Sequence, residues 1–211
     1  MNARTTLILT LALGISLPAA AQQSGAYLGA AVTASRGSNL SSGEVNDFLV
    51  QAGYRNPMTD IDRKDSGYKI FAGYAFSPNL AIELTESDIG EFSTRTTVTG
   101  GAVNARYQAK ATSLDAVLSA PVSDLLSVFG RIGIARTRTD ANFSSSGIVG
   151  LQFTQASRSK SAPHYGVGVQ YALAKQWAVR AELERFAKLG DDSTGGELRT
   201  ATYSLGLVYR F

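Results

Sequence analysis

The stretch Tyr-Ser-Leu-Gly-Leu-Val-Tyr-Arg-Phe, residues 203–211, decides the fold of this chain. Side chains alternate between the two faces of an extended strand, so every second residue shares a face. One face here is large and apolar, with Tyr203, Leu205, Leu207, Tyr209 and Phe211. The other face is small or charged. Because a solvated tail has no use for an aromatic end, the pattern favours a strand that faces lipid on one side.

The beginning of the chain has the pattern of a secretory signal peptide. Arg4 precedes a mostly apolar run from Leu7 to Leu17, and Ala19-Ala20-Ala21 supplies small residues for cleavage. The apolar run is too short to span a bilayer as a helix, and a retained anchor is the alternative. We therefore expect residues 1–21 to be a signal peptide and residues 22–211 to form one domain.

Composition limits the classes of function. The 211 residues include 20 Lys and Arg against 17 Asp and Glu, a balance too close to neutral to indicate nucleic-acid binding. The chain has no cysteine, which excludes a disulfide framework and thiolate chemistry. Beyond the signal peptide, no segment approaches the ~20 continuous apolar residues of a membrane helix. A membrane-spanning form must therefore be a closed barrel, which satisfies its backbone hydrogen bonds in lipid.

Alternating patterns along the chain predict eight strands. We place them at residues 25–34, 67–76, 80–89, 110–120, 125–138, 162–173, 177–187 and 200–211. The gaps after the second, fourth and sixth strands are short, at 77–79, 121–124 and 174–176. The other gaps are long, at 35–66, 90–109, 139–161 and 188–199. This layout is typical of outer-membrane barrels, with turns in the periplasm and four long loops outside, and it places both termini in the periplasm.

The alternation alone does not say which face points outward. A soluble lipocalin-type barrel would turn the apolar face inward and leave residues such as Gly73 and Gly133 on a solvated surface. The opposite arrangement fills a narrow interior with small and charged residues. It also places Trp177 and Phe211 near the short-turn rim, at the interfacial level that aromatic residues favour. We therefore predict an all-β, eight-stranded antiparallel up-and-down transmembrane barrel.

Several segments together resemble the OmpA-like family of small outer-membrane β-barrels. They are Gly-Tyr-Lys-Ile-Phe-Ala-Gly-Tyr at 67–74, Ala-Ile-Glu-Leu at 81–84, Phe-Gly-Arg-Ile-Gly at 129–133, His-Tyr-Gly-Val-Gly-Val-Gln-Tyr at 164–171 and the terminal Tyr-Arg-Phe. The resemblance implies an integral protein of the outer membrane of a Gram-negative bacterium. It also implies that the alternating residues of 203–211 are an assembly signal for the barrel-assembly machinery. Two-domain members carry a peptidoglycan-binding domain after the barrel; this sequence ends at the barrel, so the resemblance implies no anchoring to the cell wall.

Eight charged side chains are expected to point into the barrel. They are Lys69, Glu83, Asp115, Arg131, Arg180, Glu182, Glu184 and Arg210, four of each sign. Side chains just fill an eight-stranded barrel, and buried charges must be paired. We interpret the set as an internal salt-bridge plug. The alternative, which resembles what is proposed for the family, is that rearranged pairs open a narrow ion path.

Catalysis has little support in the sequence. His164 is the only histidine, we expect it at the long-loop rim, and one histidine cannot build a multi-histidine metal site. We predict that the protein is not an enzyme and uses no metal or cofactor.

The long loops hold two further features. In the first loop, Ser41 and Glu44 have capping-box spacing and Gly53 fits a helix end, so we expect a helix that covers the barrel mouth or contacts a partner. Around the third loop lies a group of basic residues, Arg136, Arg138, Arg158 and Lys160. Their charges are either simply solvated or paired with lipopolysaccharide phosphates, since Arg binds phosphate through two hydrogen bonds.

We predict a mainly structural role, in membrane integrity and in presenting four loops at the surface. A small, low-conductance porin and an adhesion or partner-binding protein are the alternatives. The predicted partners are outer-membrane lipid, lipopolysaccharide and, during biogenesis, the assembly machinery; extracellular ligands at the loops belong to the third hypothesis.

Overall fold

The computed structural model describes residues 24–38, 42–62, 64–147, 155–189 and 198–211. The predicted signal peptide and the capping residue Ser41 lie outside them. The described part forms nine strands and one helix. These are β1 (Gly25–Ser38), α1 (Ser42–Gln51), β2 (Met58–Asp62), β3 (Lys64–Ser77), β4 (Leu80–Val98), β5 (Gly101–Pro121), β6 (Leu126–Gly147), β7 (Gln155–Ala172), β8 (Trp177–Leu189) and β9 (Leu198–Arg210).

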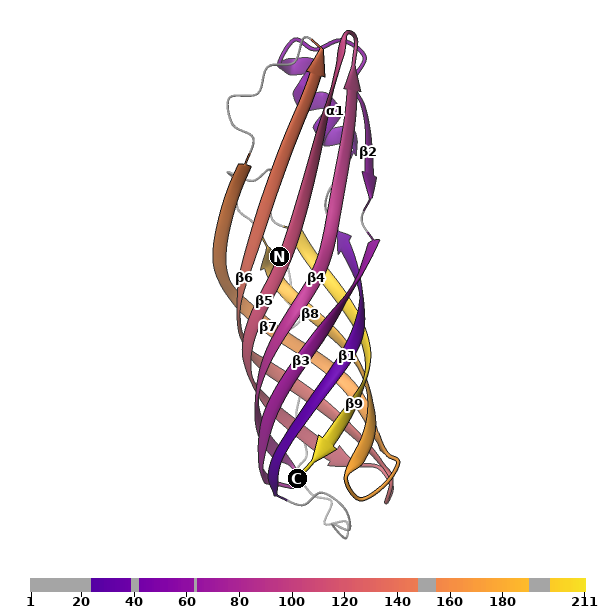
Figure 1. The fold of residues 1–211 in the computed structure, drawn as a ribbon, viewed down its shortest axis with the longest axis vertical. Coiled ribbons are helices and arrows are strands. Elements are labelled where there is room, and N and C mark those ends of the chain that lie inside the picture. Colours follow the sequence, from indigo (N-terminus) through magenta and orange to yellow (C-terminus); the bar gives the residue numbers. More distant parts are fainter. Residues whose placement is uncertain (1–23, 39–41, 63, 148–154, 190–197) are drawn as a thin grey trace, which may run out of the picture.

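Eight of these strands close into a ring (Figure 1). Every strand except β2 pairs antiparallel with its sequence neighbours, and β9 closes the ring against β1, with Leu205 opposite Val32. The short strand β2 pairs with β4 at Ser93–Thr97, beyond the residues of β4 that pair with β3. The predicted eight-stranded antiparallel barrel is confirmed, with β2 as an addition outside the ring.

The short turns, the start of β1 and the end of β9 gather at one end of the barrel. Residues 78–79, 122–125 and 173–176 connect strands there, and β1 begins and β9 ends at the same level (Figure 1). The three short connections therefore lie where the sequence predicts them. We call this end the turn rim and the opposite end the hairpin end.

Two of the predicted long loops are largely strand. β4 continues to Val98 and β5 starts at Gly101, so only a two-residue turn remains of the loop expected at 90–109. β6 and β7 likewise extend into the loop expected at 139–161, of which residues 148–154 lie outside the described part. We call the strand segments 90–98, 101–109, 139–147 and 155–161 the hairpin blade. They project beyond the rest of the barrel (Figure 1).

The first connection contains the predicted helix. α1 ends in the expected way: Gly53 has a φ of 88°, and the N–H groups of Gly53 and Tyr54 donate to the carbonyls of Val50 and Leu49, both at 3.0 Å. Thr59 of β2 donates to the side chain of Asn46 at 2.7 Å and joins the helix to the strand. Among the described residues, no helix is long and apolar enough to cross a bilayer.

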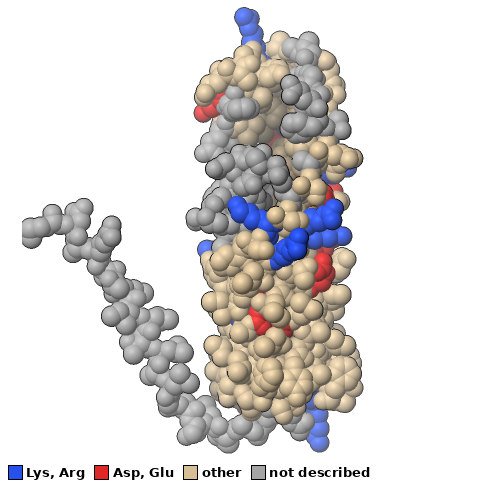
Figure 2. Space-filling model, turned by 90° about the vertical axis from the view of Figure 1, so that its left-hand side faces the viewer, with Lys and Arg blue, Asp and Glu red and all other residues tan. Residues whose placement is uncertain are grey.

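The apolar side chains cover the outside of the barrel. Val32, Ile132 and Leu205 are 68%, 65% and 57% exposed, and they belong to a girdle that runs around all eight strands. In Figure 2 the surface of the lower half of the molecule accordingly carries few charged side chains. The lipocalin-type arrangement, with the apolar face inward, is therefore wrong. Trp177, Tyr209 and Phe211 form a contiguous aromatic group at the turn rim, with ring centroids 4.9 and 5.1 Å apart.

The interior is layered along the barrel axis. A first apolar layer near the turn rim consists of Tyr27, Phe71, Ala81, Val117, Phe129, Ala178 and Val208. A second apolar layer toward the hairpin end consists of Ile89, Phe92, Ala109, Ala111, Ala135 and Phe186. Glycine makes room for the aromatic rings, since a Cβ at Gly73 would lie only 2.1 Å from Cζ of Tyr27. Charged residues occupy the space between the two layers.

Candidate functional site

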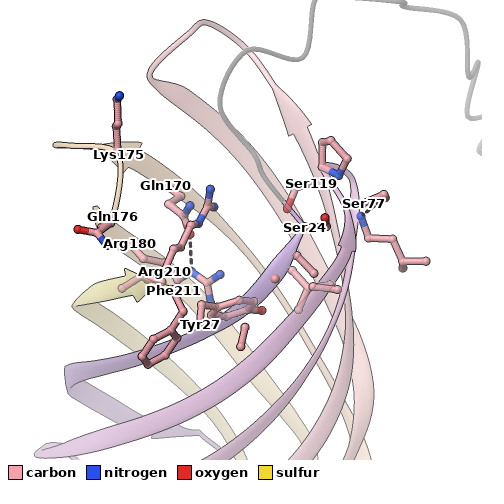
Figure 3. A pocket seen from close by; sticks show the side chains of 18 residues that line it. Ser24, Tyr27, Ser77, Ser119, Gln170, Lys175, Gln176, Arg180, Arg210 and Phe211 are labelled. Carbon is pink, nitrogen blue, oxygen red and sulfur yellow. Dashed lines mark hydrogen bonds between the residues drawn. The ribbon is translucent and has the colours of Figure 1, made fainter.

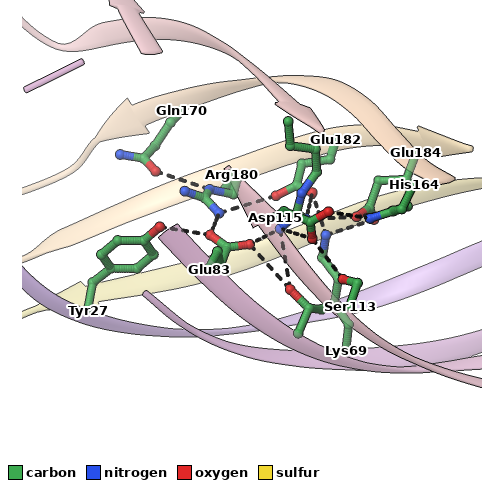
Figure 4. Close-up of polar contacts among 12 residues, drawn as sticks. Tyr27, Lys69, Glu83, Ser113, Asp115, His164, Gln170, Arg180, Glu182 and Glu184 are labelled. Atoms are coloured by element: carbon green, nitrogen blue, oxygen red, sulfur yellow. Dashed lines mark hydrogen bonds and ion pairs between the residues drawn. The ribbon is translucent and has the colours of Figure 1, made fainter. Parts of the chain in front are cut away.

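The charged residues lie at inward positions of five strands. Along β8, the inward side chains run in the order Ala178, Arg180, Glu182, Glu184 and Phe186, so charges follow one apolar layer and precede the other. β3, β4, β5 and β6 each contribute one more charged side chain at the same level. Seven buried side chains result, here called the charged core: Lys69, Glu83, Asp115, Arg131, Arg180, Glu182 and Glu184 (Figure 4).

Arg131 lies at the centre of the charged core. Its guanidinium contacts all four carboxylates: Glu184 at 2.7 Å, Glu182 at 3.0 Å, Asp115 at 3.4 Å and Glu83 in close contact. The side chain is 0% exposed. The register provides the space, because Gly133 faces Asp115 and a Cβ at Gly133 would lie 2.4 Å from its carboxylate oxygen. One cation therefore compensates acids from three strands.

Lys69 and Arg180 neutralise the acids on either side of Arg131. Lys69 contacts Glu182 closely and lies 2.8 Å from Glu184. Arg180 lies 2.7 Å from Glu83, whose second bond on the same oxygen comes from the Tyr27 hydroxyl at 2.9 Å.

The guanidinium of Arg180 also lies against aromatic rings. The centroids of Phe129, Phe71 and Tyr27 are 4.7, 4.9 and 5.7 Å from its central carbon. Cation–π attraction to three rings is stronger where water is excluded. Arg180 thus joins the charged core to the first apolar layer.

The structure adds His164 to the charged core. Its Nδ1 lies 2.8 Å from Asp115 and its Nε2 lies 3.5 Å from Glu184, while its ring stacks on Phe186 with centroids 4.5 Å apart. The expected position at the long-loop rim is wrong because β7 continues for nine residues before His164. The alternation of residues 164–171 places His164 on the inward face, but this alternation does not give the depth of the side chain along the barrel axis.

Arg210 lies apart from the charged core. It is partly buried at the turn rim, where it lines a cavity together with Arg180. The charged core therefore contains three permanent cations against four carboxylates, with the imidazole of His164 beside Asp115 and Glu184. The predicted balance of four cations against four carboxylates included Arg210 and left out His164.

The assembly-signal residues face outward, as strand alternation requires. Tyr203, Leu205, Leu207 and Phe211 are exposed, and Tyr209 lies between the rings of Trp177 and Phe211. Their role as a signal stays a prediction.

The three predicted basic residues whose side chains the structure describes separate into two groups. Arg136 and Arg138 point outward from β6, directly beyond the last girdle residue Ile134. Lys160 is partly buried, because it lies between the exposed residues Ser159 and Ser161 and so on the opposite face of β7. The side chain of Arg158 lies outside the described part. Lys110 is a neighbour that sequence reasoning missed, because it faces Arg138 only through the pairing of β5 with β6.

The described residues offer no cluster of three or more His, Cys, Asp and Glu side chains arranged to hold a metal ion. The acids of the charged core are instead engaged by cations. The arrangement is suited to holding strands together and filling the lumen.

The comparisons with known proteins agree with this architecture. The model of the outer membrane protein β-barrel domain matches residues 7–211. The chain belongs to this outer-membrane β-barrel family. Its relatives include Outer membrane protein A of Serratia marcescens, 32% identical over 164 residues, which are 76% of this chain and 43% of the relative. Outer membrane protein A of Yersinia pseudotuberculosis is 31% identical over 146 residues, 69% of this chain and 40% of the relative.

These relatives confirm the resemblance to OmpA-like barrels and the outer membrane as the location of this family member. The chain spans less than half the length of either relative. Solved structures share the fold: Neisserial surface protein A has a TM-score of 0.57 at 12% identity, and Ail of Yersinia pestis has a TM-score of 0.54 at 18% identity. Each alignment covers 90% of this chain and 100% of the neighbour.

Proposed function

We propose that this family member is a closed, structural barrel that presents a stiff hairpin blade at the cell surface. The observation that carries the proposal is the layered interior, in which the charged core lies between two apolar layers. An ion that crossed the barrel would have to pass both apolar layers and separate buried ion pairs. The family layout of turns inside and long connections outside supports a periplasmic turn rim.

Planar-bilayer recording tests the closed lumen. We expect the native barrel to show little or no steady current. Arg180→Ala should raise conductance, because it removes the cation that links the charged core to the first apolar layer. Arg106→Ala is the matched control, since Arg106 is 65% exposed and pairs with Glu91 on the outer surface. A steady ohmic current through the native protein would support the small porin instead.

A second proposal concerns the outward basic residues. Lys110 faces Arg138 directly across β5 and β6, and Arg136 lies two residues nearer the girdle. Like charges placed opposite each other destabilise a sheet, and Asp140 bonds Arg138 from one side at 3.1 Å. We infer that a phosphate of lipopolysaccharide binds between Lys110 and Arg138, at the outer edge of the girdle. Figure 2 shows basic side chains gathered above the uncharged half.

The adhesion hypothesis has narrower support. Ail of Yersinia pestis, which shares the fold, was solved with the heparin analogue sucrose octasulfate. The exposed faces of the hairpin blade give this chain a surface for an extracellular partner. No motif in them specifies one, so the structural role remains the conclusion.

A further inference from the structure

A cavity of about 670 Å³ opens at the turn rim. Its walls are the rim ends of the strands and the residues next to the turns, including Ser77, Ser119 and Gln176 (Figure 3). It reaches inward to Tyr27 and Arg180, the residues that hold Glu83. Its size falls within the range of small-molecule sites. The cavity therefore extends from the turn rim to the first apolar layer and to Arg180, at the edge of the charged core.

The charged side chains that line this cavity are all positive. Lys175, Arg180 and Arg210 line it, and the described lining residues include no Asp or Glu side chain. Lys175 lies on the β7–β8 turn, and the backbone N–H of Arg210 donates to the carbonyl of Gln176 at 2.9 Å, which holds the end of β9 against that turn. Lys175 and Arg210 thus line the same cavity mouth from different segments of the chain.

The deeper wall also presents hydrogen-bond donors. Arg180 donates through Nε to Oε1 of Gln170 at 3.1 Å. The carbonyl oxygen of Gln170 is thus occupied, and the remaining polar group of this buried side chain is its NH2 donor. Figure 3 shows Gln170, Arg180 and Arg210 gathered on one side of the cavity.

We propose that this cavity binds a small phosphate-bearing anion, with Arg210 and Lys175 as its direct ligands above Arg180. Arginine matches phosphate oxygens through paired hydrogen bonds, and the partly enclosed walls strengthen the attraction relative to bulk water. The proposal rests on the proposed function only for the compartment, because a periplasmic turn rim makes the periplasm or the inner lipid leaflet the source of the ligand.

Calorimetric titration of the refolded full chain in zwitterionic micelles tests the site, with sodium pyrophosphate as the probe. We expect saturable binding of one anion per barrel. Arg210→Gln and Lys175→Gln should each weaken it by about tenfold, the loss of one charge-assisted contact, whereas Arg210→Lys should retain most of it. Arg95→Gln, which removes an exposed charge from the hairpin blade, is the matched control and should bind like the native protein.

The outcomes separate the alternatives. Absence of saturable binding to the native barrel would overturn the proposal. Binding that survives both the Arg210 and Lys175 substitutions, or that falls equally in Arg95→Gln, would place the anion elsewhere and also overturn it. If bicelles containing phosphatidylglycerol displace pyrophosphate, the ligand is a lipid headgroup; if they do not, it is a soluble anion. The Lys175 variant lies on an exposed turn and keeps the test valid if an Arg210 variant fails to fold. A conducting or inverted barrel would refute the proposed function without changing this titration.

Discussion

Arg131 shows how much of this barrel depends on single residues. Arg131→Ala would leave four buried carboxylates with only Lys69 and Arg180 as permanent counter-charges. Removing one partner of a buried ion pair costs about 3–5 kcal/mol, so we expect a loss of that size in the free energy of unfolding. Urea titration of the barrel refolded into phospholipid vesicles measures it. Arg106→Ala breaks an exposed pair with Glu91 and should cost at most about 1 kcal/mol.

A double-mutant cycle shows whether the loss comes from the ion pairs. Glu184→Gln removes the charge that lies 2.7 Å from Arg131, so the combined variant should lose less stability than the two single losses added together. Additive effects, or equal losses for Arg131→Ala and Arg106→Ala, would contradict the charged core as the stabilising centre.

The sequence predicts the inward charges well at this scale and their partners poorly. Strand alternation alone puts Glu83 and Arg131 inside, whereas their contact depends on the registers of β4 with β5 and of β5 with β6, and on barrel closure. For the same reason, His164 lies with the charged core although the sequence places it at the rim, and Arg210 lies at the turn rim although the sequence places it among the core charges. A residue's depth along the axis depends on where its strand begins, and β7 begins at Gln155 rather than at the predicted residue 162.

At the scale of strands, β9 tests the assignment of inside and outside. Leu205 is 57% exposed and has Val32 and Ala181 beside it on the outer surface. Leu205→Arg should lower the free energy of unfolding in vesicles by roughly 2–4 kcal/mol, the cost of an arginine that faces the middle of the bilayer. Leu205→Ala is the matched comparison and should cost much less, because the lipid fills the space of the missing side chain. Equal stabilities of the two variants would reject a lipid-facing position.

β4, β5 and β6 are longer than their sequence pattern predicts, and they occupy much of the loops expected at 90–109 and 139–161. In the girdle, large apolar side chains alternate with small or charged ones, which makes the strand pattern visible. In the hairpin blade the outward residues are polar, such as Arg106 and Gln108, and several inward ones are alanines such as Ala105 and Ala109. The contrast in hydrophobicity between the faces is weak there, so the segment reads as a loop, although Thr and Val near 94–98 favour a strand.

For the whole molecule, the girdle and the basic residues together predict an orientation. Lipopolysaccharide added to refolded barrels in micelles should raise the thermal unfolding midpoint of the native protein. The double variant Lys110→Gln/Arg138→Gln should lose most of this increase, because both direct phosphate ligands are gone. Lys175→Gln removes a charge at the opposite rim and should keep it. An equal increase in all three proteins would argue against a lipopolysaccharide site at the hairpin end.

The two-residue turn at the tip of β4 and β5 has a mechanical consequence. From Asp88 to Val98, β4 extends for roughly 30 Å at about 3.3 Å per residue, and its ladder with β5 continues to the pair Val98–Gly101. A pull on the tip along the strand direction would draw β4 and β5 together and load in shear the ladder of β5 with β6, which runs from Gly101–Gly147 to Pro121–Ser127, whereas a flexible loop would first uncoil. Force applied by anything attached to the tip would therefore pass almost directly into the wall of the barrel.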